Sequence, residues 1–260
     1  MTISELWKKD SYLDKDISYL ISTEIIEYDM KSAGFNLTKY YNLLDQDKID
    51  YLSTLSKKRQ TIQIGLYQKA DKEYRNNLAK AFINMRKQFF EANNIQDSDV
   101  ISVKKDAIFL TRHCKEVEFG NVLFSMKNTY SSYYYMGNLE LYLGDNKLDI
   151  KGIKDEKLAL HNPYMRETLF EFFKLIEKGS FNYAIRQLKE FADYYKARQI
   201  PVGYYRELNA SSKYRIKNDL YSDIIGEKTD LLSDNVGDSS ILDISYNYLN
   251  FIVPLINVLI

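Results

Sequence analysis

The hydrophobic pattern of this 260-residue chain switches from strand-like to helical spacing and back, and this order restricts the possible fold more than any other feature. After a lead-in or short helix at residues 11–22, the first strand-like run covers residues 21–30, with β-branched Ile25 and Ile26 and polar positions that alternate through Glu27 and Asp29. Apolar residues then recur at three- and four-residue steps, which predicts helices. These helical stretches are residues 32–44, 47–68 and 72–93.

The middle of the chain predicts a sheet. Residues 100–109 are typical of a hairpin that turns at Lys104-Lys105-Asp106. Further strands are expected at 119–124, 130–136 and 139–143, with Lys127-Asn128 joining the first two. Helical spacing returns over 165–177 and 182–198, and Gly179-Ser180 separates these two stretches.

This order of elements predicts an α+β fold with a mixed or antiparallel sheet, packed helices and a helical C-terminal lobe. We expect one domain over residues 1–160, with a small helical insertion at about 45–93. The helical lobe is expected over residues 161–260.

Composition narrows the function classes. Lys plus Arg equals Asp plus Glu at 36 each, so a uniformly basic nucleic-acid-binding domain is excluded, although a local basic face is not. The single cysteine, Cys114, excludes an internal disulfide framework and a multi-cysteine zinc site, and it fits a reducing cytosol. The presence of only two histidines argues against a histidine-rich metal site.

The most apolar stretch is residues 251–260, which Pro254 and Asn257 interrupt. It is shorter than the roughly 20 residues that a membrane span needs. We therefore expect no membrane contact and interpret the stretch as a packing segment or a docking segment for a protein partner.

Two aspartates carry the strongest chemical signal. Asp29 ends the strand at 21–30, and Asp106 lies in the predicted hairpin. Two carboxylates delivered by adjacent strands can hold a pair of magnesium ions for phosphoryl transfer. Each also has an ordinary explanation. Asp29 could cap the following helix, as Ser32 could equally do, and Asp106 could be a turn residue paired with its lysines.

Four short elements resemble the palm of family B DNA polymerases. Asp29-Met30-Lys31-Ser32 keeps the aspartate and the serine of the family's first palm motif, and Asp106-Ala107-Ile108-Phe109 keeps the second aspartate and the Ile-Phe of its hairpin motif. Lys127-Asn128-Thr129-Tyr130 is similar to a Lys-x-Tyr element that contacts the primer–template duplex, and Lys151-Gly152 to a Lys-Gly pair before the thumb. The series follows the family's order over residues 25–153.

The resemblance implies a minimal, divergent and phage-encoded palm and thumb, acting as a polymerase-like nucleotidyltransferase in the host cytoplasm. Its partners would be a primer–template and nucleoside triphosphates, and its cofactor Mg²⁺ held by Asp29 and Asp106. The expected nucleotide-binding residues are Ser32, Gly34, Phe35, Lys58 and Arg59, and the expected nucleic-acid-binding residues are Lys127, Tyr130 and Lys151.

The sequence departs from the family at three places. Lys104 replaces the first hairpin aspartate, which lowers the local negative charge and competes for the carboxylates. The family's Lys-x-x-x-Asn-Ser-x-Tyr-Gly fingers motif is not present in that form. Gly34 takes the place of the tyrosine that excludes a 2′-hydroxyl, which implies that ribonucleotides are accepted, unless a slip of one residue brings Phe35 there.

Two alternatives stay open. One is a catalytically inactive palm-like module of a phage that binds nucleic acid or a protein, and Lys104 favours it. The other is an interaction protein of unrelated α+β fold that docks through residues 251–260. Lys127 and Tyr130 could then be an ordinary surface lysine and strand tyrosine, and Lys57-Lys58-Arg59 a solvated helix face.

Overall fold

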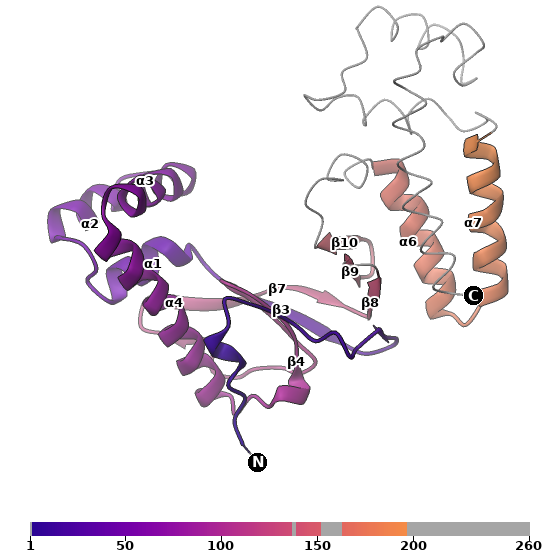
Figure 1. The fold of residues 1–260 in the computed structure, drawn as a ribbon, viewed down its shortest axis with the longest axis horizontal. Helices are drawn as coiled ribbons and strands as arrows, with labels where there is room; N and C mark the ends of the chain where they lie inside the picture. Colours follow the sequence, from indigo (N-terminus) through magenta and orange to yellow (C-terminus); the bar gives the residue numbers. More distant parts are fainter. Residues whose placement is uncertain (1, 137–138, 152–162, 197–260) are drawn as a thin grey trace, which may run out of the picture. The chain divides into compact units, whose positions relative to one another are not determined.

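The computed structural model describes residues 2–136, 139–151 and 163–196. The chain divides into two compact units, the first formed by Met1–Ile17 and Thr23–Tyr130 and the second by Ser18–Ser22 and Ser131–Ile260. Both units combine helices with antiparallel strands, which confirms the predicted α+β class (Figure 1). The division falls after Tyr130, whereas the sequence led us to expect a first domain that extends to residue 160.

The first unit is built on a six-stranded sheet in the order β1-β4-β5-β3-β7-β6, in which every neighbouring pair is antiparallel. Its strands are β1 (Ser11–Leu13), β3 (Ile25–Met30), β4 (Val100–Lys104), β5 (Ala107–Leu110), β6 (Glu118–Phe119) and β7 (Val122–Tyr130). Strand β3 lies between β5 and β7, so its C-terminal end is next to the β4–β5 hairpin.

Four helices and two short 3-10 turns complete this unit. They are η1 (Leu6–Lys8), α1 (Ala33–Tyr40), α2 (Gln46–Ser53), α3 (Lys57–Ala70), α4 (Lys72–Ala92) and η2 (Asp97–Asp99). The predicted apolar stripe of α4 forms the core against the sheet, where the ring of Phe89 lies 5.5 Å from that of Tyr28 and 4.2 Å from that of Phe124. Helices α2 and α3 stand beyond the end of the sheet, where β3 leads into α1 (Figure 1).

Three local predictions were wrong. Residues 47–68 form two helices, because extended backbone at Ser56 (ψ 153°) separates α2 from α3. Residues 11–22, expected as a lead-in or short helix, contain two strands, β1 and β2 (Tyr19–Leu20). Lys127-Asn128 is not a link between strands, because β7 continues through both residues to Tyr130.

The predicted hairpin is confirmed. Lys104 pairs with Ala107, so Lys105 and Asp106 alone form the turn between β4 and β5. Lys105 adopts a left-handed conformation, with φ 47°, which tight two-residue turns between antiparallel strands commonly require. The turn thus places Asp106 at the end of the hairpin.

The second unit carries a four-stranded antiparallel sheet in the order β10-β9-β8-β2, formed with β8 (Ser132–Met136), β9 (Leu139–Leu143) and β10 (Leu148–Lys151). Within the described part of this unit two helices follow, α6 (Pro163–Glu177) and α7 (Phe181–Lys196), as the sequence predicts for the start of the C-terminal lobe. Phe173 of α6 packs against Tyr134 with ring centroids 4.5 Å apart. The predicted docking segment at 251–260 lies outside the described residues. Among the described helices, none is long and apolar enough to cross a membrane.

Candidate functional site

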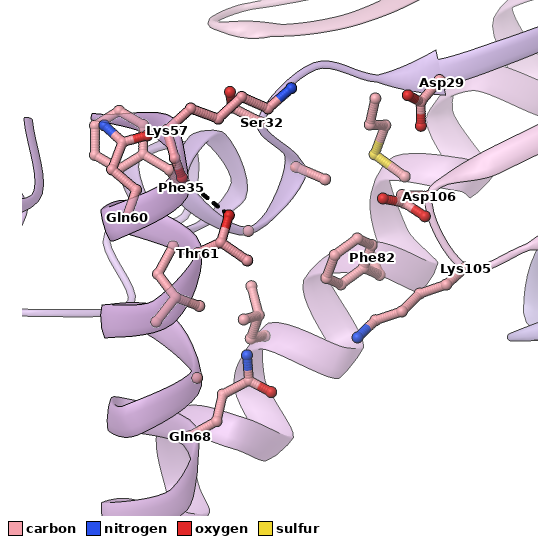
Figure 2. A pocket seen from close by; sticks show the side chains of 16 residues that line it. Asp29, Ser32, Phe35, Lys57, Gln60, Thr61, Gln68, Phe82, Lys105 and Asp106 are labelled. Carbon is pink, nitrogen blue, oxygen red and sulfur yellow. Dashed lines mark hydrogen bonds between the residues drawn. The ribbon is translucent and has the colours of Figure 1, made fainter. Parts of the chain in front are cut away.

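A cavity of about 400 Å³ opens where β3 leads into α1. One wall carries the carboxylates of Asp29 and Asp106, and the opposite wall is a polar face of α3 with Lys57, Gln60 and Thr61 (Figure 2). Its remaining lining is largely apolar and comes from Met30, Ala33, Gly34, Phe35, Ile64, Leu78 and Phe82, together with Ser32, Gly65, Gln68 and Lys105. Cavities of this size and mixed lining are typical of small-molecule sites.

Strand pairing brings the two aspartates together. Asp29 is opposite Ala107, the residue that follows Asp106, and the Met30 N–H donates to the Asp106 carbonyl at 2.9 Å. Burial raises the pKa of the Asp106 carboxyl, and the negative charge of Asp29 raises it further, while its own backbone N–H and the charges of Lys105 and Lys127 act in the opposite direction. The two carboxylates therefore share one wall of the cavity and repel each other.

A buried arginine holds the turn that carries Asp106. Arg86 of α4 is fully buried, and its Nη1 donates to the Lys105 carbonyl at 2.6 Å. Its Nε donates to the Trp7 carbonyl at 3.0 Å, and its Nη2 pairs with Asp10 at 2.9 Å. The Lys105 N–H in turn donates to the Asp10 carbonyl at 2.8 Å. Contacts from α4 and from the N-terminal segment thus fix the position of the β4–β5 turn.

A lysine and a third carboxylate complete the site. The Lys127 Nζ lies 3.2 Å from Asp29 Oδ2 and 3.6 Å from Glu27 Oε1. Glu27 is only 1 % exposed, and its Oε2 accepts hydrogen bonds from Asn128 Nδ2 and from the Tyr130 hydroxyl, the latter at 2.9 Å. Burial lowers the pKa of Lys127, but Glu27, Asp29 and Asp106 outweigh that effect and raise it overall. Lys127 is therefore held as a cation.

A β-bulge explains how Lys127 reaches these carboxylates. On β7, Asn128 pairs with Glu27 and Met126 pairs with Tyr28, so Lys127 is the extra residue between two consecutive residues of β3. Bulges re-aim side chains next to functional sites. In regular pairing Lys127 would be opposite Tyr28, whose ring packs in the core against α4. The bulge instead directs its ammonium to the face that carries Glu27 and Asp29.

Some of the residues that were predicted to bind nucleotide line the cavity, and the others lie outside it. Ser32, Gly34 and Phe35 line the cavity, and Ile64 lies 3.5 Å from where a Gly34 Cβ would be. Lys58 and Arg59 are exposed on α3 outside the lining, while their neighbour Lys57 belongs to it.

The predicted nucleic-acid-binding residues lie in three different environments. Lys127 is half-exposed beside Asp29, and Tyr130 is 2 % exposed with its hydroxyl on Glu27. Lys151 belongs to the second unit, with its ammonium 5.9 Å from the ring centroid of Tyr142. Lys104 lies in the same cross-strand row as Asp29, with Ala107 between them.

Sequence reasoning missed several residues of the site. Glu27 stands two residues before Asp29, and the alternation of a strand was a usable signal that both share one face. Lys57, Gln60, Thr61 and Ile64 follow helical spacing, which marks one face of a helix but not the side that meets the cavity. Arg86 gave no signal in the sequence, because its partners, two backbone carbonyls and the carboxylate of Asp10, lie far from it along the chain.

The donor set suits one magnesium ion better than two. Within the described residues no group of three or more His, Cys, Asp or Glu side chains is placed to hold a metal ion. Magnesium is commonly bound by one or two carboxylates, with water and substrate phosphates supplying its other ligands, and Asp29 and Asp106 can provide that much. A second ion would share these carboxylates with Lys127, which already contacts Asp29.

A family model described as Bacteriophage PBS1 gene 130 protein matches residues 1–260, the whole length of the chain. Comparison with curated proteins found no match.

Proposed function

We propose that this chain, which belongs to the Bacteriophage PBS1 gene 130 protein family, is a polymerase-like nucleotidyltransferase that extends or primes a nucleic-acid chain in the host cytoplasm. The observation that carries the proposal is the cavity itself. Asp29 and Asp106 lie on one wall, and Lys57, Gln60 and Thr61 face them from α3 (Figure 2). An acidic wall facing a basic and polar wall suits a metal-bound triphosphate.

Each part of the cavity has a place in this reaction. Lys57 and Lys105 would attract the phosphates, and Phe35 and Phe82 offer apolar surface to the sugar and base. A magnesium ion held by Asp29 and Asp106 would polarise the α-phosphate and lower the pKa of the primer 3′-hydroxyl. The primer 3′-oxygen forms a bond to the α-phosphorus, and the bond between that phosphorus and the oxygen that bridges the α- and β-phosphates breaks. Pyrophosphate leaves, and the proton of the 3′-hydroxyl passes to solvent.

The remaining predicted contacts belong to the same proposal. Lys58 and Arg59, exposed on α3, would meet the phosphates of an incoming nucleotide or strand. Lys127, which is half-exposed, would contribute to the primer–template contact, and Lys151 of the second unit would make a separate contact. Tyr130 is too buried to touch a duplex, so its part would be limited to the hydrogen bond that its hydroxyl donates to Glu27. Gly34 has no side chain that would exclude the 2′-hydroxyl of a bound nucleotide. Ribonucleotides would therefore be accepted as well as deoxyribonucleotides.

Nucleotide incorporation on a primed template tests this function. We expect magnesium-dependent extension that Asp29→Asn and Asp106→Asn each reduce about 100-fold or more, since each removes a ligand worth several kcal/mol of transition-state stabilisation. Asp149→Asn is the matched control, because Asp149 also pairs with a lysine, Lys147, but lies in the second unit. If neither Asp29→Asn nor Asp106→Asn reduced nucleotide incorporation, this cavity would be excluded as the catalytic site. Strict rejection of ribonucleotides would exclude only the Gly34 proposal.

One observation favours the alternative of an inactive palm-like binding module. Lys127 forms an ion pair with Asp29, which partly neutralises a residue that catalysis needs. The same assay separates the two functions. Duplex binding without incorporation, unchanged by Asp29→Asn and Asp106→Asn, would favour the module.

A further inference from the structure

We propose that Lys127 is a resident cation of this site and takes the place of one of the two metal ions that phosphoryl transfer between paired carboxylates commonly uses. The inference rests on the function proposed above, because it concerns how the same carboxylates are charged and what else they can bind.

Lys127 lies where a second metal ion would bind. Its Nζ is 3.2 Å from Asp29 Oδ2, and its charge also acts on Asp106. A magnesium ion bound to the same Oδ2 would lie about 2 Å from that oxygen. The ion and the ammonium could then be no more than about 5 Å apart, a distance at which like charges repel strongly. A single ion held by Asp106 and by the other oxygen of Asp29 would leave the ammonium in place, and a second ion on Oδ2 would have to displace it.

Two carboxylates, those of Asp29 and Glu27, hold the ammonium of Lys127 in place. Glu27 is almost fully buried, and a buried carboxylate needs a compensating partner. Asn128 and Tyr130 both donate to Oε2, so Oε1 is the oxygen that faces Lys127 at 3.6 Å. A lysine whose only role was on the surface would not need a buried carboxylate beneath it.

The bulge in β7 directs the side chain of Lys127. Lys127 reaches Asp29 and Glu27 only because β7 carries one extra residue opposite Glu27 and Tyr28. Bulges interrupt the hydrogen-bond ladder, so a bulge that delivers one cation to a carboxylate pair is a specific feature of this site.

Metal binding tests the proposal without any nucleotide. The probe is Mn²⁺, and the EPR signal of the free ion gives the number bound per chain. Site-bound ions are defined as those lost in an Asp29→Asn, Asp106→Asn double variant. We expect the wild-type chain to bind one such ion. Lys127→Met is expected to bind a second, or to bind the first at least about tenfold more tightly, because repulsion at this distance exceeds the 1.4 kcal/mol that a tenfold change represents.

Two further variants control the test. Lys127→Arg keeps the charge and should bind one ion with wild-type affinity. Lys147→Met removes a lysine in a comparable ion pair, with Lys147 46 % and Asp149 27 % exposed against 51 % and 26 % for Lys127 and Asp29, and should change nothing.

Three results would overturn the proposal: two site-bound ions in the wild-type chain, none in it, or unchanged binding in Lys127→Met. If Lys127→Met does not fold, the wild-type count and Lys127→Arg still decide. A chain that binds metal as expected but incorporates no nucleotide would refute the proposed function and leave this inference standing.

Discussion

At the scale of single residues, the surroundings of Asp106 disfavour its ionised form. Burial and the charge of Asp29 raise its pKa, so the folded chain holds the Asp106 proton more tightly than the unfolded chain does. The contribution of this group to stability is therefore retained at low pH and lost as the pH rises through the folded pKa. Near neutral pH, an ionised Asp106 destabilises the fold.

Replacing that charge should stabilise the protein. We expect Asp106→Asn to raise the melting temperature at pH 7 by about 1–3 °C, because the amide keeps the shape of the side chain and removes both the repulsion and the cost of burying a charge. The gain should vanish below about pH 3.9, the ordinary pKa of an aspartate, where the wild-type side chain is neutral as well. Thermal denaturation followed by circular dichroism at both pH values measures this. A lower melting temperature for Asp106→Asn at pH 7 would contradict the prediction.

The one cysteine gives a second prediction at this scale. Burial raises the pKa of Cys114 to about 11, so its thiol stays protonated at neutral pH. Alkylation by iodoacetamide in the folded protein should speed up about tenfold per pH unit from pH 7 to pH 10, because only the thiolate reacts. The protein unfolded in guanidinium is the control and should level off near pH 8.5. A native rate that also levels off there would show that the thiol is not shielded.

At the scale of elements, the hairpin β4–β5 depends on helix α4. Arg86 donates to the carbonyls of Trp7 and Lys105 and pairs with Asp10, and both carbonyls would lose this donor in Arg86→Met. We expect that variant to lose about 2–4 kcal/mol of unfolding free energy, since charged hydrogen bonds contribute about 1.5–3 kcal/mol each and partial relaxation recovers some of it. Urea denaturation measures the loss.

Asp10→Asn is the matched control for Arg86. It weakens one exposed partner but keeps both carbonyl contacts, so a loss below about 1 kcal/mol is expected. If Arg86→Met proved as stable as the wild-type protein, the hairpin would not need this anchor.

At the scale of the whole molecule, net charge and local charge must be separated. The chain carries equal numbers of acidic and basic residues, 36 each, so any nucleic-acid affinity has to come from local contacts. If Lys58 and Arg59 contact phosphates, their replacement by alanine should make the plot of log K against log salt shallower by nearly two, about 0.9 for each contact. Binding to a labelled duplex across a salt series measures this slope.

Two lysines elsewhere provide the control for that slope. Lys8 pairs with Glu5 and Lys87 with Glu91, so their double replacement by alanine removes the same formal charge at another place. The slope should stay as in the wild-type chain. Equal changes in both double variants would mean that the chain binds nucleic acid through its general charge and not through α3.

The sequence by itself determined the class of the fold and the approximate positions of most of its main elements. Periods of two and of 3.6 residues are local properties, so they placed the helices of the first unit, the strands on either side of them and the start of the helical lobe. The hairpin turn at Lys105-Asp106 was also readable, because the turn lies between two short apolar runs. Asp29 and Asp106 could be paired in advance for the same reason, since both stand at strand ends.

Only the tertiary structure decided how the site is charged and which helix face lines it. Lys127 is the extra residue of a bulge, and an extra residue is defined by the partner strand, so β7 alone does not show it. The polar face of α3 meets the cavity with Lys57 instead of Lys58 and Arg59, because packing against α1 and α4 sets the rotation of the helix. Register and rotation depend on contacts between residues far apart in the chain, and local periodicity carries no information about them.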